Sequence, residues 1–262
     1  MIVQAAFNLA ALQLRILGAM ILRETRATFG SSQIGYLWAI ITPAASVAVL
    51  VTIFSLIGRQ PPFGSSLALF FATGILTLEF YVKLSATLMN SFDANRALLT
   101  YPLIRETDAL FARLVLISFT YLLIMLIFFS ALIALGLAGV PHRPEIVLQA
   151  FIATAALGFG LGTINAVILS FWEAWHHVDK VINRPLLFIS GVFYVPSLLP
   201  PEAVAVLEWN PILHLVEWFR VGYYPNYHSP ILQADYPAAL ALVTCTIGLG
   251  AERLFRKQRA SR

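Results

Sequence analysis

Residues 110–138 read LFARLVLISFTYLLIMLIFFSALIALGLA, in which Arg113 is the only charged residue. A helix that crosses the hydrocarbon core of a bilayer needs about 20 predominantly apolar residues. The stretch exceeds that length and contains no proline. It therefore predicts a transmembrane helix.

The composition of the whole chain points the same way. Apolar residues make up 59% of the 262 positions, charged residues make up 11%, and the mean hydropathy is +0.81. A soluble domain carries about 25% charged residues, so this chain has too few charges to cover a water-facing surface. We predict a single all-α membrane domain over residues 1–262, with no nucleic-acid partner.

Six segments satisfy the length criterion for a membrane span. They are 35–58, 66–90, 110–138, 146–171, 181–199 and 236–252. Residues 1–34 instead predict an amphipathic interface helix, because Gln4, Asn8, Arg15 and Arg26 fall within about 40° of one another on a helical wheel. Such a basic amphipathic helix lies in the plane of the membrane, although Gln13 and Glu24 depart from the pattern.

The stretch 191–235 carries six prolines and is still apolar. Its two candidate helices, about 201–208 and 211–222, are too short to cross a bilayer, and prolines at their starts suit the first helical turn. Non-helical backbone at membrane depth must be buried in protein or line a water-filled cavity. We predict two short re-entrant or periplasmic helices within 200–235. The alternative is an ordinary periplasmic loop.

Lys and Arg are distributed unevenly between the two sides of the predicted spans. With the N-terminus in the cytoplasm, thirteen are cytoplasmic and three are outer, and Lys83 lies within a span. The cytoplasmic residues are Arg15, Arg23, Arg26, Arg96, Arg105, Arg113, Lys180, Arg184, Arg253, Arg256, Lys257, Arg259 and Arg262; the outer residues are Arg59, Arg143 and Arg220. Because cytoplasmic loops carry the excess of basic residues, both termini are predicted in the cytoplasm, and 253–262 forms a basic tail.

The sequence contains no Gly-x-x-x-x-Gly-Lys-Ser/Thr phosphate loop and no arrangement that supports a nucleophile–base pair. We therefore predict no catalytic residues, no cofactor and no metal site on this chain. Gly158, Gly160 and Gly162 lie within an apolar span and are interpreted as small residues for close helix packing. His176 and His177, near Glu173 and Asp179, favour a solvated turn over a metal site.

Glu79 and Lys83 lie within the second predicted span. An ionisable residue inside a membrane span is a candidate functional residue. The two are four residues apart, so they share a helix face and can pair with each other. Two interpretations stay open: a self-neutralised pair that faces the protein interior, and a pair that lines a transport pathway.

Several separated blocks of the sequence resemble one family. The first is LRETRATFG at 22–30, followed by IGYLWA at 34–39 and then Pro43; the second is NRALLTYP at 95–102; the third is GVFYVP at 191–196, followed by Leu199-Pro200, Trp209-Asn210-Pro211 and Arg220. The blocks resemble ABC-2 type exporter permeases. The first block more narrowly resembles the KpsM-like subfamily, which exports capsular polysaccharide.

The resemblance implies a homodimer in the bacterial inner membrane that docks two copies of a separate ABC ATPase subunit, where ATP and Mg would bind. It implies a lipid-linked polysaccharide as cargo, with a periplasmic adaptor and an outer-membrane channel completing the route. The first helix and the turn at 91–105 would contact the ATPase, through Arg23, Arg26, Arg96, Arg105 and Glu106. The alternative for these charges is simple topology determination.

Aromatic side chains are the candidates for contacts with a sliding sugar chain, because their faces cover apolar C–H groups while polar groups bond hydroxyls. The candidates are Tyr36, Trp38, Phe193, Tyr194, Tyr223 and Tyr224, with Glu79 and Lys83 between the two ends of the pathway. Trp and Tyr also collect at membrane interfaces as anchors, which is the alternative for each of them.

Other functions remain to be weighed against capsule export. An ABC-2 permease could instead carry O-antigen, teichoic acid or a small drug. A secondary transporter would show several buried charges or an inverted repeat, and the sequence shows one charge pair and no convincing repeat. A membrane-embedded enzyme would need clustered His, Asp or Ser, for which His176 and His177 give thin support.

Overall fold

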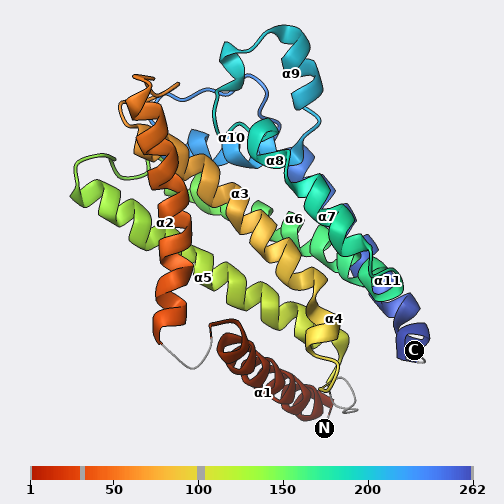
Figure 1. Cartoon of the computed structure of the whole chain (residues 1–262). Coiled ribbons are helices and arrows are strands. Elements are labelled where there is room, and N and C mark those ends of the chain that lie inside the picture. The colour runs from red at the N-terminus through yellow and green to blue at the C-terminus, as the bar shows by residue number, and fades with distance from the viewer. Residues whose placement is uncertain (1, 30–32, 99–103, 261–262) are drawn as a thin grey trace.

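A computed structural model of the chain describes residues 2–29, 33–98 and 104–260, and the side chains of 13–26, 37–98 and 104–259 (Figure 1). Within these residues every regular element is a helix. The elements are α1 (Ile2–Phe29), α2 (Gln33–Leu56), α3 (Leu67–Met89), α4 (Ser91–Ala94), α5 (Glu106–Ala134), α6 (Pro144–Phe171), α7 (Trp175–Asn183), α8 (Leu186–Ile189), the 3₁₀ turn η1 (Pro196–Leu198), α9 (Pro201–Leu207), α10 (Pro211–Tyr223) and α11 (Asp235–Ala260). The all-α prediction is confirmed for the described part of the chain.

Five of these helices are long and apolar enough to cross a membrane. The candidate spans are Leu37–Leu56, Leu67–Met89, Glu106–Ala134, Pro144–Phe171 and Asp235–Arg259. They coincide with five of the six predicted spans, so those predictions are confirmed as to helix and length. The count of six is not confirmed.

The predicted fifth span, 181–199, does not form one long helix. Pro185 separates α7 from α8, because proline has no N–H to continue the helical hydrogen-bond ladder. Arg184 and Pro185 themselves keep right-handed helical dihedrals, so 175–189 runs on as an interrupted helix about 22 Å long at 1.5 Å per residue. Gly191, with φ of 74°, then turns the chain. The interrupted helix is shorter than the roughly 30 Å hydrocarbon core.

Helix α6 lies at the centre of the packing and contacts α11, α3 and α10. Its glycines allow close approach. A Cβ on Gly160 would lie 2.6 Å from the Cys245 backbone nitrogen in α11, and a Cβ on Gly162 would lie 3.0 Å from Ser85 in α3. The prediction that these glycines serve helix packing is confirmed. Helix α2, in contrast, leaves most of its described side chains exposed.

The short helices predicted at 201–208 and 211–222 are present as α9 and α10. Helix α10 begins at Pro211 and is capped by the Asn210 side chain, which accepts a hydrogen bond from the Ile212 N–H at 3.0 Å. Most of its side chains are buried, so α10 belongs to the packed body of the protein. Whether it enters the membrane stays a prediction.

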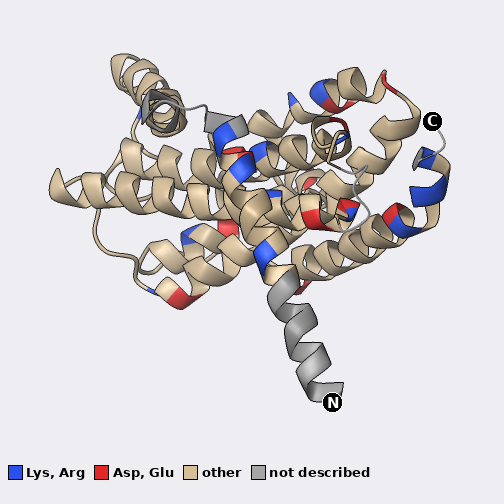
Figure 2. Cartoon of the chain, turned by 90° about the horizontal axis from the view of Figure 1, so that it is seen from below, with Lys and Arg blue, Asp and Glu red and all other residues tan. Residues whose placement is uncertain are grey.

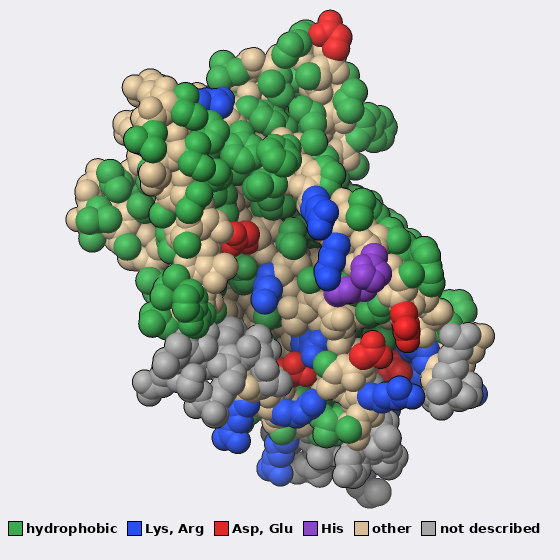
Figure 3. All heavy atoms as spheres, viewed as in Figure 1, with side chains coloured by type: hydrophobic (Ala, Val, Ile, Leu, Met, Phe, Trp, Pro, Cys, Tyr) green, Lys and Arg blue, Asp and Glu red, His purple; other side chains and the backbone are tan. Residues whose placement is uncertain are grey.

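The two ends of the molecule differ in charge. Helix α1 and the last turns of α11 lie at one end, which we call the α1 end, and α9 lies at the other, the α9 end (Figure 1). Figure 3 shows most charged side chains of the displayed face near the α1 end, while hydrophobic side chains cover most of the α9 end. Figure 2 looks onto the α1 end and shows basic residues along the last turns of α11.

Candidate functional site

A cavity of about 270 Å³ brings together three of the residues predicted to line a pathway. Trp38 comes from the first turns of α2, and Glu79 and Lys83 come from α3. Helix α5 closes the cavity with Ile117, Thr120, Tyr121 and Ile124, and α2 adds Ala39, Thr42 and Pro43. Residues that lie about 40 positions apart in sequence therefore form one polar hollow.

The cavity follows from the side-chain pattern of α3. Most of this helix is buried, but Glu79, Lys83 and Ala86 are not, and neither is Asn90, the residue that caps its C-terminal end. Their spacing of three and four residues places them on one face of the helix. Glu79 is partly buried and Lys83 is exposed, and in the described part of the chain no ion pair joins them. The interpretation as a self-neutralised pair is therefore not what the structure displays.

Aromatic rings cluster toward the α9 end, between α2 and α8. Phe193 stacks on Phe54 with ring centroids 5.9 Å apart and on Phe188 at 5.6 Å. The Arg59 guanidinium lies 5.0 Å from the Phe54 ring centroid and donates a hydrogen bond to the Phe193 carbonyl oxygen at 3.3 Å. Next to this group, the Tyr194 hydroxyl donates to the Ile189 carbonyl oxygen at 3.0 Å. These contacts join the end of α2 to α8 and to the segment that follows α8.

Tyr223 and Tyr224 differ from the exposed Trp38 and from the partly buried Phe193 and Tyr194. Both are buried in the core. The Tyr223 hydroxyl donates to the Gly139 carbonyl oxygen at 3.0 Å, and burial raises the pKa of Tyr223 to about 12. The Tyr224 ring packs edge-on against Phe63. Since neither ring is exposed, we leave both out of the pathway proposed below. The Tyr36 side chain lies outside the described residues.

A buried ion pair under the aromatic group was missed by sequence reasoning. Arg220 and Glu217 of α10 are both fully buried, with the Arg220 Nη1 atom 3.2 Å from Glu217 Oε1. The Tyr227 hydroxyl donates to the other Glu217 oxygen at 2.7 Å. Arg220 Nη1 also donates to the Tyr194 carbonyl oxygen at 3.2 Å, and the guanidinium lies over the Phe70 ring. Arg220 therefore ties the segment after α8 to α3 and α10.

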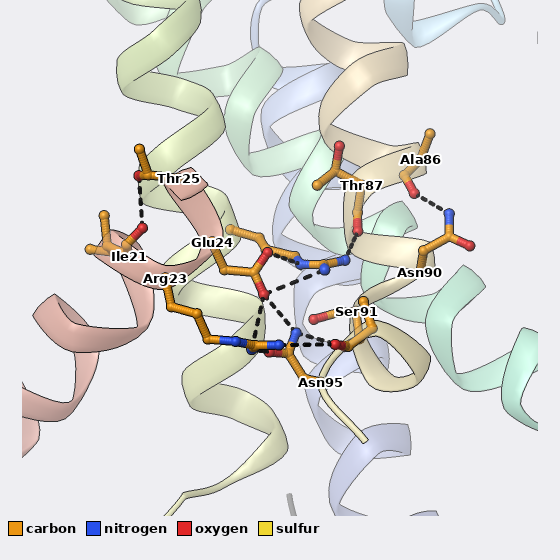
Figure 4. Close-up of polar contacts among 11 residues, drawn as sticks. Ile21, Arg23, Glu24, Thr25, Ala86, Thr87, Asn90, Ser91 and Asn95 are labelled. Atoms are coloured by element: carbon orange, nitrogen blue, oxygen red, sulfur yellow. Dashed lines mark hydrogen bonds and ion pairs between the residues drawn. The ribbon is translucent and has the colours of Figure 1, made fainter. Parts of the chain in front are cut away.

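A second buried polar network lies at the α1 end (Figure 4). The Glu24 carboxylate of α1 accepts hydrogen bonds from Arg113 Nε of α5 at 3.1 Å and from Asn95 Nδ2 at 2.8 Å. Arg113 Nη1 donates to the Thr87 carbonyl oxygen of α3 at 2.5 Å, and Arg23 donates to the Asn95 side chain. Four segments of the chain therefore meet at Glu24.

Two irregularities in the sequence were the signal for this network. Glu24 departs from the amphipathic pattern of the first helix, and Arg113 is the one charge in the longest apolar run. Each is costly when considered alone, because a buried charge needs a partner. The structure shows that each is the other's partner.

The residues predicted to contact an ATPase fall into two groups. Arg26, Arg96 and Arg105 are exposed at the α1 end. Arg23 and Glu106 make contacts within the chain instead: Arg23 Nη2 donates to the Ala94 carbonyl oxygen at 3.2 Å, and Glu106 pairs with Arg259 of α11. The first group forms a free basic surface, while the second fixes α4 and α11.

His176 and His177, which the sequence placed on a turn, lie in the short helix α7. Its Asp179 carboxylate accepts a hydrogen bond from Asn165 of α6 at 3.1 Å. Among the described residues, no three His, Cys, Asp or Glu side chains gather where they could hold a metal ion.

The fold and these sites define a polytopic helical membrane protein with a partly exposed polar cavity and a basic surface at one end. The model of the ABC-2 type transporter family matches residues 15–224. The chain belongs to that family.

Curated relatives match most of the chain. It is 29% identical over 238 residues to the polysialic acid transport protein KpsM of Escherichia coli, covering 90% of this chain and 91% of that protein. It is 26% identical to the capsule polysaccharide export inner-membrane protein CtrC of Neisseria meningitidis serogroup A, covering 94% and 93%. It is 27% identical to the capsule polysaccharide export inner-membrane protein BexB of Haemophilus influenzae, covering 82% of this chain and 81% of that protein.

Proposed function

We propose that this chain is the transmembrane permease subunit of an ATP-driven exporter that moves lipid-linked capsular polysaccharide across the bacterial inner membrane. The observation that carries the proposal is the match to three relatives named for polysialic acid or capsule polysaccharide transport, each over more than four fifths of both chains. The alternative is an ABC-2 permease for another cargo, such as O-antigen, teichoic acid or a small drug.

In this proposal the chain works as a homodimer with two ATPase subunits, which bind ATP and Mg. Both termini lie in the cytoplasm, so the α1 end faces the ATPase. The exposed Arg26, Arg96 and Arg105 support this orientation, because basic residues are retained on the cytoplasmic side. A periplasmic adaptor and an outer-membrane channel would receive the polymer at the α9 end.

The proposed pathway follows the exposed face between α2, α3 and α8. Trp38, Glu79 and Lys83 lie toward its cytoplasmic end, and Phe193 and Tyr194 lie toward its outer end. Trp38 is exposed and Phe193 and Tyr194 are partly exposed, and such aromatic faces suit a polymer that must slide, since each contact is weak and covers the apolar face of a sugar. Helix α2 is largely exposed in the single chain, which fits a second copy that completes the pathway.

Deletion of the gene in the bacterium that encodes it tests the proposal. We expect surface capsule to disappear and polymer to accumulate inside the cell, and a plasmid copy to restore export. Lipopolysaccharide and teichoic acid are measured in the same cells. Loss of one of these with capsule intact would overturn capsule export in favour of the alternative cargo.

A further inference from the structure

A second cavity, of about 330 Å³, lies between α1, α2 and α5. It shares Ala39, Thr120 and Ile124 with the polar cavity around Glu79 and Lys83. The two cavities therefore meet at a common wall where α2 crosses α5. One is apolar and the other carries an acid and a base.

The apolar cavity has the dimensions of a lipid chain. Its wall on α5 runs from Val115 to Ile127, about 18 Å at 1.5 Å per residue. Half of the roughly 30 Å hydrocarbon core, which is one leaflet, is about 15 Å. Within the described residues, α1 contributes Ile21 and Thr25 to the wall of the cavity.

Water does not suit this cavity. A buried water needs two to four polar partners, and the two hydroxyl groups in the wall already donate within their own helices. Thr25 donates to the Ile21 carbonyl oxygen at 2.7 Å, and Thr120 donates to the Leu116 carbonyl oxygen at 2.8 Å. The remaining lining is hydrocarbon. In a bilayer, the surrounding acyl chains are the matching occupant.

The adjoining charges specify the head group. The Glu79 carboxylate and the Lys83 ammonium lie one helical turn apart, line the same cavity and form no ion pair with each other. Lys83 lies about 9 Å from the α1 end of α3, from its six-residue distance to Met89 at 1.5 Å per residue. A phospholipid with a phosphate and a primary ammonium presents the complementary pair of charges.

We propose that the two adjoining cavities bind one phospholipid of the phosphatidylethanolamine class, with an acyl chain along α5 and its head group on Glu79 and Lys83. The phosphate pairs with Lys83, and the ammonium pairs with Glu79. If the proposed function holds, the head group also neutralises two fixed charges at the cytoplasmic end of the polymer pathway. The lipid site itself does not depend on the cargo, so its failure would leave the export proposal intact.

Native mass spectrometry of the full chain tests the site. The purified, delipidated protein is offered equal amounts of phosphatidylethanolamine and phosphatidylglycerol with identical acyl chains. We expect the wild type to retain phosphatidylethanolamine preferentially. Glu79→Gln should reduce that preference about tenfold, because a hydrogen bond to a charged group contributes about 1.5 kcal/mol or more. Lys83→Gln should lower retention of both lipids alike, because both carry the phosphate that pairs with Lys83.

A matched pair of variants tests the cavity. Ala39→Phe places a ring in the shared wall and should lower retention of both lipids, whereas Val49→Phe, at an exposed position of the same helix that lines neither cavity, should not. Equal retention of both lipids by the wild type, an unchanged preference in Glu79→Gln, or equal lipid retention in the two phenylalanine variants would overturn the proposal. So would efficient disulfide cross-linking of Phe119→Cys between copies, which would show that a second chain covers the cavity.

Discussion

Glu24 and Arg113 show how a buried pair fixes the first helix against its neighbour. Their side chains are 3% and 7% exposed, and each has a charge that solvent does not reach. Removing one partner of such a pair costs about 3–5 kcal/mol, mainly because the other charge is left buried and unpaired. The pair therefore makes the position of α1 on α5 specific, which apolar contact alone would leave free to slide.

We expect Glu24→Ala to lower the stability of the detergent-solubilised protein and to release α1 from α5. The loss should be on the order of 3 kcal/mol, since Arg113 stays buried without its partner. Thermal unfolding and limited proteolysis near 23–26 measure the two effects. Arg26→Ala is the matched control, because Arg26 is exposed on the same helix.

A double variant, Glu24→Leu with Arg113→Met, distinguishes the cost of an unpaired buried charge from the cost of changing these two positions. Replacing both charges by apolar side chains removes the unpaired charge, so stability should recover relative to Glu24→Ala. If Glu24→Ala is no less stable than Arg26→Ala, the ion pair does not hold α1 in place.

At the scale of elements, the network joins α1, α3, the residue that follows α4, and α5 into one unit. Asn95 follows α4 and bonds Glu24 of α1, while Arg113 of α5 bonds the Thr87 carbonyl of α3. The segment 91–98 is therefore linked through this network to α1, α3 and α5. Arg96, within this segment, and Arg105, immediately before α5, are both exposed.

Charge reversal of this turn is predicted to uncouple the ATPase. We expect Arg96→Glu with Arg105→Glu to reduce co-purification of the ATPase at least fivefold, because reversed charges repel the complementary surface of a partner. The amount of permease in the membrane should not change, since both side chains are exposed. Arg143→Glu, an exposed charge outside this turn, is the control. Unchanged co-purification with export intact would count against the proposed docking surface.

At the scale of the whole molecule, the sequence predicted the features that depend on the length of apolar segments and on the spacing of glycines. Helices were found at five of the predicted spans, over most of the first predicted segment and at the two predicted short helices, since each depends on local pattern. The predicted span 181–199 is not one continuous helix, because Pro185 and Gly191 interrupt it and hydropathy does not register such breaks; whether this segment crosses the membrane stays a prediction. Pairs such as Glu24–Arg113 and Glu217–Arg220–Tyr227 could not be predicted, because their members meet only through packing. The convergence of Trp38 with Glu79 depended in the same way on how α2 lies against α3.

Whether the interrupted helix α7–α8 crosses the membrane decides on which side each terminus lies. Five continuous spans alone would put the termini on opposite sides, whereas α1 and the end of α11 lie at the same end of the structure (Figure 1). That arrangement requires the chain to return across the membrane through 175–195. We therefore predict that Arg26 and Lys257 lie in the cytoplasm and that Ser197 and His228 lie in the periplasm. All four are exposed.

Single cysteines at these positions, in a Cys245→Ala background, report the side directly. In cells with a permeabilised outer membrane, an impermeant thiol reagent should label Ser197→Cys and His228→Cys at once, and should label Arg26→Cys and Lys257→Cys only after lysis. The positions on α1 and α11 must behave alike if the interrupted helix crosses, because the number of crossings is then even. Labelling of Lys257→Cys but not Arg26→Cys in unlysed cells would mean an odd number, and α7–α8 would have to lie on one side of the membrane.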